Sequence, residues 1–279
     1  MSKRRSAYAR HDAAHCNAPG LFRPLMKGDY ARLKLNVTYV YGKTELRFRG
    51  PEPLGGSELR VLQAIVACAG PSTSMLKVAA PAGEVGQRLA KALDFRDAEV
   101  GAELRVVSTT LGALLAEAGY KSDGQAQRKA VMESLRRLAA VTIFCISGPR
   151  ERSMRVLSYD VDADSGGLSI AINARLSAAV AGGGYTHINM DEVRALRTDP
   201  ARVLHQRLCG YISPGKRHPT AVGVDALAGH VYGDPNGISD ATVRQRRTTV
   251  RCALKELVDL GWEVRPVGGA YSIGRPAKP

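Results

Sequence analysis

Two amphipathic helices, each followed by a predicted β-hairpin, recur in the chain at a constant offset of 119 residues (Val131 to Val250). This repeat constrains the fold more than any other feature, because the agreement covers the apolar helix face and the first hairpin strand together. Agreement of the helices alone is expected by chance between amphipathic helices. The superposed positions are Val131, Leu135 and Leu138 on Val250, Leu254 and Leu257, and Ile143 and Cys145 on Trp262 and Val264.

Each long helix is preceded by a shorter helix and followed by two strands. The first copy has a helix over 111–118, a long helix from about residue 125, and strands 141–146 and 154–161 around the turn Gly148–Arg152. The second copy has a scaffold helix with Val224, Leu227 and Val231 on one face, a long helix capped by Ser239, and strands 262–265 and 270–273 around Gly268–Gly269. This order is typical of a winged helix-turn-helix. The sequence therefore predicts an α+β fold with two tandem winged helix-turn-helix domains.

A run of three glycines, Gly182–Gly184, is the predicted boundary between the two domains. Residues 1–28 are then a basic N-terminal arm, residues 29–181 the first winged-helix domain, and residues 185–279 the second, DNA-reading one. Hydrophobic spacing and turn residues predict further elements. They are a hairpin over 33–48 around Gly42–Lys43, a helix capped by Ser57 with Leu59, Leu62, Ile65 and Val66 on one face, a loop over 70–86, a strand over 168–172 and a helix over 173–181. A further helix is opened by the cap Asp199 and by Pro200, with Val203, Leu204, Leu208 and Ile212 on its buried side.

The net charge of +14 at pH 7 favours a polyanionic partner, and nucleic acid more than a membrane surface. No stretch reaches the ~18 consecutive apolar residues of a membrane span. No apolar segment follows the basic start, as it does in a secretory signal. The five cysteines are odd in number, widely spaced and set among apolar residues. These features predict reduced thiols in a cytoplasmic protein.

The second long helix carries a dense set of cations. Between Ala241 and Lys255 there are five basic residues and no acidic one. Arginine can fork onto guanine or phosphate, and a threonine hydroxyl and methyl suit base edges, so this helix is the predicted recognition helix. The alternative is a merely solvated basic face, which the neighbouring scaffold helix and hairpin make less favoured. The predicted DNA-binding residues are Arg244, Arg246, Arg247, Thr248, Arg251 and Lys255.

The first long helix has a weaker polar stripe at the equivalent positions. Its predicted DNA-binding residues are Gln125, Arg128, Lys129 and Arg136. The predicted wings add Arg150 and Arg152 in the first domain and Arg265 in the second. The cations Lys3, Arg4, Arg5 and Arg10 of the arm suit a DNA groove, although basic termini are commonly disordered.

Two segments resemble catalytic motifs without completing them. Gly210–Lys216 matches G-x-x-x-x-G-K, but Arg217 stands where a phosphate loop needs Ser or Thr, and the segment follows a helix rather than a strand. His11–His15 is similar to H-E-x-x-H, but Asp12 replaces the glutamate and no third ligand follows at a useful spacing. We therefore expect no catalytic centre, no metal site and no cofactor, and regard the His11–Cys16 segment as structural or DNA-contacting.

Four blocks of the sequence and its end are distinctive. The four blocks are "RHDAAHCNAPGLFR" (10–23), "GPEPLGGSELRVLQAIVACAGP" (50–71), "GGGYTHINMDEVRAL" (182–196) and "ARVLHQRLCGYISPGK" (201–216), and the end is "LKELVDLGWEV" (254–264). All five segments resemble the RepC replication initiators of IncQ-type plasmids. The resemblance implies an initiator that binds directly repeated origin DNA (iterons) and acts beside a separate plasmid helicase and primase.

Two recognition helices on one chain can enter successive major grooves about one turn (~10 bp) apart. One chain is then expected to read one double-stranded repeat without a partner, with a homodimer possible off DNA. Initiators on adjacent repeats are expected to strain the duplex and promote local opening for helicase loading. A winged-helix transcriptional regulator is the alternative, and the family resemblance alone separates the two.

Overall fold

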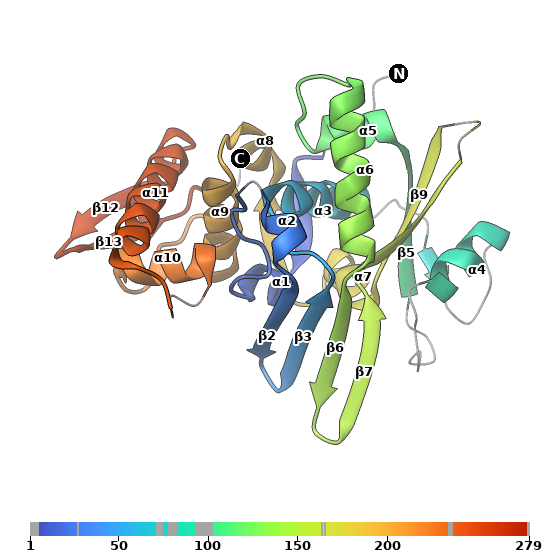
Figure 1. The fold of residues 1–279 in the computed structure, drawn as a ribbon, viewed down its shortest axis with the longest axis horizontal. Coiled ribbons are helices and arrows are strands. Elements are labelled where there is room, and N and C mark those ends of the chain that lie inside the picture. The colour runs from blue at the N-terminus through green and yellow to red at the C-terminus, as the bar shows by residue number, and fades with distance from the viewer. Residues whose placement is uncertain are drawn as a thin grey trace.

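The computed structural model describes residues 6–26, 28–70, 75–77, 83–92, 103–162, 164, 166–233 and 237–277 (Figure 1). Its elements up to the first long helix are β1 (Tyr8–Asp12), α1 (Ala13–Asn17), α2 (Asp29–Arg32), β2 (Leu35–Tyr41), β3 (Thr44–Gly50), α3 (Gly56–Cys68), β4 (Met75–Lys77), α4 (Gly83–Ala92), β5 (Glu103–Thr110), α5 (Leu111–Glu117) and α6 (Gln125–Ala139). The remaining elements are β6 (Thr142–Ser147), β7 (Arg150–Arg155), β8 (Leu157–Val161), β9 (Gly167–Ile172), α7 (Ala174–Ala181), β10 (Tyr185–Asn189), α8 (Met190–Ala195), α9 (Asp199–Tyr211), β11 (Val222–Gly223), α10 (Val224–Tyr232), α11 (Asp240–Asp259), β12 (Glu263–Val267) and β13 (Ala270–Gly274).

The described strands form antiparallel sheets that alternate with helices, so the architecture is a mixed α+β one, as the sequence predicts. The sheet orders are β2-β3-β6-β7, β4-β5-β9-β8, β11-β13-β12 and β1-β10. In the first sheet, Phe48 of β3 lies opposite Ile143 of β6. The hairpin β6–β7 is therefore not isolated but is extended by the hairpin β2–β3, and the four strands run side by side below α6 in Figure 1.

Both copies of the predicted repeat are present. We call α5, α6 and the hairpin β6–β7 the first unit, and α10, α11 and the hairpin β12–β13 the second unit. Every superposed apolar position of α6 and α11 is buried, and so are Ile143 and Trp262 at the starts of the hairpins. Both glycines of the turn Gly268–Gly269 have positive φ, the geometry of a tight hairpin turn. The helix, helix and hairpin order predicted for each unit is confirmed.

Helix α3 lies at the centre of the molecule, and most of its residues are buried. Leu59, Leu62 and Ile65 are fully buried, and the helix packs against α5, α6, α9 and β1. The predicted cap at Ser57 is wrong. The helix begins at Gly56, with Gly55 as N-cap, and the Glu58 carboxylate accepts a hydrogen bond from the Gly55 N–H at 2.7 Å.

The start of α9 also differs by one residue from the prediction. Thr198, not Asp199, is the N-cap, because its hydroxyl accepts a hydrogen bond from the Ala201 N–H at 3.4 Å. Pro200 remains in the first turn, where its missing N–H costs nothing. The predicted buried face of this helix, which includes Leu204 and Leu208, is confirmed.

Three predicted strand or loop boundaries are wrong. The segment 70–86 contains β4 and the start of α4, while its residues 71–74 and 78–82 lie outside the described part of the chain. The turn predicted over Gly148–Arg152 is only Gly148–Pro149, so Arg150 and Arg152 belong to strand β7. The strand predicted over 154–161 breaks at Val156, after which β8 joins a different sheet.

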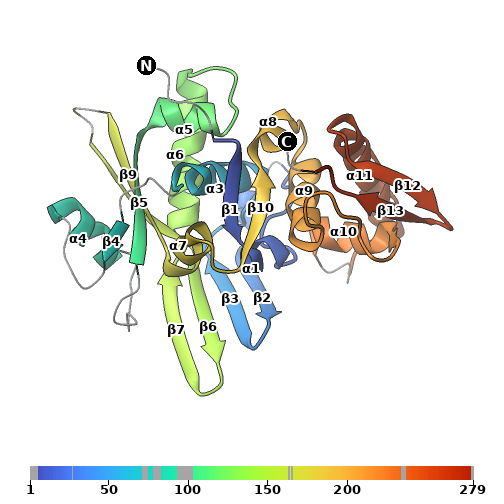
Figure 2. The same cartoon turned by 180° about the vertical axis from the view of Figure 1, so that it is seen from behind.

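Residues 8–17, which the sequence assigns to a basic arm, lie inside the fold. Strand β1 pairs with β10 over its whole length, and the two strands run side by side in Figure 2. In the sequence, β1 precedes the glycine run Gly182–Gly184 and β10 directly follows it, so the pairing joins segments on both sides of the predicted domain boundary. Residues 1–5, with Lys3, Arg4 and Arg5, lie outside the described residues. The division into an arm and two domains at residues 29–181 and 185–279 stays a prediction.

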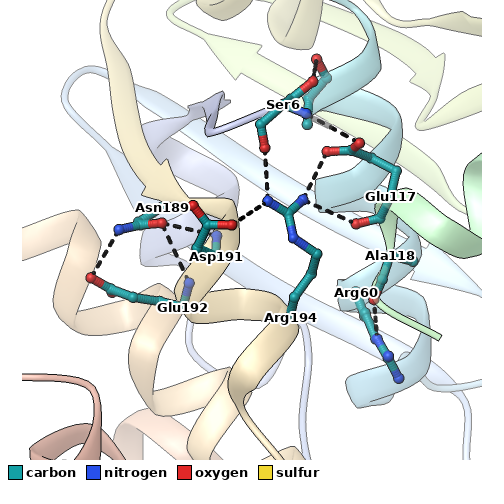
Figure 3. Close-up of polar contacts among 9 residues, drawn as sticks. Ser6, Arg60, Glu117, Ala118, Asn189, Asp191, Glu192 and Arg194 are labelled. Carbon is teal, nitrogen blue, oxygen red and sulfur yellow. Dashed lines mark hydrogen bonds and ion pairs between the residues drawn. The ribbon is translucent and has the colours of Figure 1, made fainter. Parts of the chain in front are cut away.

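Arg194 of α8 makes polar contacts with three segments of the chain (Figure 3). Its Nη1 donates to Glu117 Oε1 at 3.1 Å, and its Nη2 donates to the Ser6 carbonyl at 2.9 Å and to Asp191 Oδ1 at 2.7 Å. The side chains of Arg194 and Glu117 are only 10% and 7% exposed. One guanidinium therefore joins the segment before β1, the end of α5 and the helix α8.

Candidate nucleic-acid interface

Helix α11 has one side fixed in the core and one side in solvent. Ser239 caps it by accepting a hydrogen bond from the Thr242 N–H at 3.3 Å, as the sequence predicts. Val250, Leu254 and Leu257 are buried, and the helix packs against α9 and α10. The exposed side therefore carries the basic residues, because they follow the apolar ones at helical spacing.

Four of the six predicted residues of α11 are exposed. They are Arg244, Thr248, Arg251 and Lys255. The Thr248 hydroxyl donates to the Arg244 carbonyl at 3.1 Å. Its hydrogen is thus used within the helix, and only its methyl group and its oxygen lone pairs remain for a partner.

Arg246 and Arg247 have partners within the second unit. The Arg246 guanidinium lies over the Tyr232 ring, 4.8 Å from its centroid. The Arg247 Nε and Nη2 donate to the two carboxylate oxygens of Asp225, in the first turn of α10, at 2.6 and 2.7 Å. Because of this hydrogen bonding, the pKa of Asp225 is lowered and that of Arg247 is raised. Sequence reasoning missed Asp225, since no local pattern links two residues on different helices.

Helix α6 presents its predicted stripe in the same way. Gln125, Arg128, Lys129 and Arg136 are all exposed. The Arg128 Nη2 donates to Asp123 Oδ2 at 2.6 Å, from the turn that precedes the helix. The next cation along this helix, Arg137, has a structural role, since it pairs with Glu52 and Glu58 and lies 3.9 Å from the Tyr30 ring centroid.

The hairpins contribute fewer free cations than predicted. Arg150 is exposed at the start of β7, whereas Arg152 is half-buried in the same strand opposite Cys145. Arg265 is exposed on β12, where its Nη2 lies 3.4 Å from Glu263 Oε2. Arg150 and Arg265 are therefore the predicted wing residues that stand furthest into solvent.

The family model of replication protein C (RepC) matches residues 3–277, nearly the whole chain. The chain belongs to the replication protein C family. No curated protein sequence matches it. Membership is therefore established by a match that spans both units and every predicted DNA-binding residue.

The structure of this RepC family member is also similar to domains 2 and 3 of RctB. One crystal structure, of selenomethionine derivatives, gives a TM-score of 0.55 at 11% identity and covers 94% of this chain and 97% of that chain. A second, of RctB domains 2-3, gives a TM-score of 0.49 at 10% identity, over 91% of this chain and 92% of that chain. At such identity the first likeness establishes the fold alone.

The His11–Cys16 segment of this RepC family member is part of the core. His11, Asp12, His15 and Cys16 are buried, and Asp12 contacts both the His15 Nδ1 and the Arg175 guanidinium. Burial and the nearby His15 lower the pKa of His11 to about 4. Within the described residues, no group of three or more His, Cys, Asp or Glu side chains is placed to hold a metal ion. The segment therefore has a structural role, and a DNA-contacting one is excluded by its burial.

The segment Gly210–Lys216 is a helix end followed by a turn. Gly210 lies within α9 where the helix approaches α1, and a Cβ there would be 2.2 Å from Asn17 Oδ1. The Gly215 N–H donates to the Pro276 carbonyl at 2.9 Å, and the Arg275 N–H donates to the Lys216 carbonyl at 2.8 Å. These glycines therefore serve helix packing and a chain reversal.

Among the described helices, none has the length and apolar character that a bilayer crossing requires.

Proposed function

We propose that this RepC family member is a plasmid replication initiator that binds directly repeated origin DNA (iterons) through two winged helices. The observation that carries the proposal is the exposed basic side of α11, which lies next to the hairpin β12–β13. It is matched by the exposed stripe of α6 next to β6–β7. In a winged helix the second helix enters the major groove and the hairpin contacts the backbone, so α11 and α6 are the proposed recognition helices.

The arrangement of the two helices supports simultaneous binding. Both α6 and α11 lie on the side of the molecule that faces the reader in Figure 1. Two recognition helices can enter major grooves about one turn, or ~10 bp, apart. One chain then reads one double-stranded repeat without a dimer partner, and α11, which has more cations than α6, contributes more of the affinity.

Duplex opening follows from the strain that several bound chains impose. Bending a site costs on the order of 1–6 kcal/mol and is offset by the additional contacts that the bend permits. The strain favours melting of a nearby A·T-rich segment, where a plasmid helicase and primase act. In this proposal the chain needs neither nucleotide nor metal.

The test is footprinting of the full chain on the origin of the plasmid that encodes it. We expect protection of each repeat, and we expect Arg251→Ala to lose about 1–3 kcal/mol of specific binding because it removes a cation from the exposed side of α11. Arg197→Ala is the charge-matched control, since Arg197 is 73% exposed and pairs with Asp259 instead. Its specific binding should stay unchanged.

Two outcomes contradict the proposal. Equal affinity of Arg251→Ala and the wild type at moderate salt excludes α11 as a recognition helix. Protection of a promoter without protection of the origin repeats favours the alternative function, a winged-helix transcriptional regulator.

A further inference from the structure

An acidic side chain stands on the basic face of the second unit. Asp225 is 63% exposed and holds Arg247, which is 39% exposed, through both carboxylate oxygens. A carboxylate at a DNA-binding face repels phosphates, which lowers non-specific affinity. An exposed ion pair also adds little to stability. Neither affinity nor stability explains why this acid lies there.

The geometry of the pair shows what the acid does for the arginine. The two Asp225 carboxylate oxygens accept hydrogen bonds from Nε and Nη2, which form one edge of the Arg247 guanidinium (a side-on pair). The Nη1 hydrogens and the second Nη2 hydrogen stay free of Asp225, and no other hydrogen-bond partner of Arg247 appears in the described part of the chain. These hydrogens form the end-on fork, whose two parallel N–H groups match the O6 and N7 acceptors of guanine.

The first unit has an acidic partner at the equivalent position, held by a single hydrogen bond rather than by two. Arg128 of α6 superposes on Arg247 of α11 in the sequence repeat, and its Nη2 is held by Asp123 at 2.6 Å. Asp123 comes from the turn before α6, whereas Asp225 comes from the scaffold helix α10. Gly112 leaves the room for it, because a Cβ there would be 2.8 Å from Asp123 Oδ2. The same recognition-helix position thus has an acidic partner from two unrelated places.

We propose that Asp225 is a positioning residue that aims Arg247 at one guanine of each repeat, and that Asp123 does the same for Arg128. The inference rests on the proposed function. Fixing the fork against a carboxylate removes rotamers that would place the guanidinium on a phosphate. Arg247 and Arg128 are then residues that read sequence, whereas Arg244 and Lys255 bind the backbone.

The experiment measures binding of the full chain to one cloned repeat in which each guanine is replaced in turn by 7-deazaguanine. This base lacks the N7 acceptor. For the wild type we expect one guanine near the second unit at which the replacement costs about 10-fold in affinity. In Asp225→Asn this loss should shrink to about 2-fold or less, while affinity for unrelated duplex DNA rises because a negative charge is gone.

Two matched variants complete the design. Asp259→Asn removes the same charge from an exposed ion pair with Arg197, and it should keep the full discrimination. Arg247→Lys keeps the cation but has no fork, so it should lose the same discrimination as Asp225→Asn. The double variant Arg247→Lys with Asp225→Asn should lose no more than either single one.

The outcomes separate this inference from the proposed function. If the wild type binds the repeat specifically and Asp225→Asn discriminates at every guanine as the wild type does, the positioning role is overturned and the proposed function stands. If the wild type binds the repeat no better than unrelated DNA, both are overturned. Loss of discrimination in Asp225→Asn and Arg247→Lys, but not in Asp259→Asn, supports the inference.

Discussion

His205 is a fully buried histidine whose neighbours favour its charged form. Its Nε2 lies 2.7 Å from Glu192 Oε2 and 3.5 Å from Cys209 Sγ, and the Trp262 Nε1 donates to the same glutamate oxygen at 3.1 Å. Although burial lowers the pKa of His205, Cys209 and Glu192 together raise it to about 9. The charged pair joins α8, α9 and the start of the hairpin β12–β13, so its protonation state affects how firmly the second unit is held.

The pH dependence of stability follows from the direction of this shift. The pKa of His205 is raised from 6.5 to about 9 in the folded chain. As the pH rises, the unfolded chain therefore loses the His205 proton at a lower pH than the folded chain does. The stabilisation is complete below about pH 6.5 and is lost as the pH rises toward 9. We therefore expect the wild-type free energy of unfolding, from urea titrations, to fall over this range more steeply than that of His205→Gln. Parallel pH profiles of the two proteins contradict the raised pKa.

At the scale of elements, the sequence predicts best what depends on spacing alone. The buried faces of α6, α9 and α11 are correct because helical periodicity records which side meets the core. The cap of α3 is missed because the Glu58 side chain, not that of Ser57, accepts the hydrogen bond at the start of the helix, from the Gly55 N–H. The start of β7 is missed because this is an edge strand, where exposed polar residues such as Arg150 are tolerated and resemble a turn.

In the candidate interface, too, the features that depend on spacing are predictable from the sequence, and the contacts between helices are not. The exposed stripes of α6 and α11 are predictable from periodicity. When the apolar residues of a helix line one face that is buried in the core, the basic residues on the opposite face point into solvent. Their partners are not predictable, because Asp225 meets Arg247 only once α10 and α11 are packed. Arg246 illustrates the same point, since its contact with Tyr232 depends on where α10 ends. The sequence thus locates the surface but not the ion pairs that orient it.

Gly119, which follows the end of α5, lies close to the backbone of α8. Its φ is +76°, and a Cβ there would lie 3.0 Å from Arg194 Cα. Because backbone strain and overlap with a backbone atom add up, we expect Gly119→Ala to cost about 2–4 kcal/mol in unfolding free energy. Gly148→Ala is the control, since φ there is +57° but nothing lies within 4 Å. Equal costs for the two variants, measured by urea denaturation, would show that the approach of α8 adds nothing.

At the scale of the whole molecule, the two units share one continuous core. A single buried apolar cluster extends from Ala9 to Ile273. Between the central helices α3 and α9, the Gln63 Nε2 donates to Gln206 Oε1 at 2.9 Å in the buried interior. Together with the β1–β10 pairing, these contacts fix the first unit relative to the second. A fixed spacing between the two proposed recognition helices suits the reading of a repeat of fixed length, because no entropy is lost in ordering one unit against the other on binding.

Arg194 tests whether this continuity makes the chain unfold as one unit. Arg194→Ala leaves the Glu117 carboxylate, 7% exposed, without its cation, and the loss of one partner of a buried pair costs about 3–5 kcal/mol. The sole tryptophan, Trp262, reports on the second unit, whereas far-ultraviolet circular dichroism reports on the whole chain. We expect both signals to shift together to lower urea in Arg194→Ala. In Arg197→Ala, whose ion pair is exposed, the shift should stay within about 1 kcal/mol. If the tryptophan transition of Arg194→Ala stays at its wild-type position while the dichroism transition moves, the two units unfold independently and the junction does not couple them.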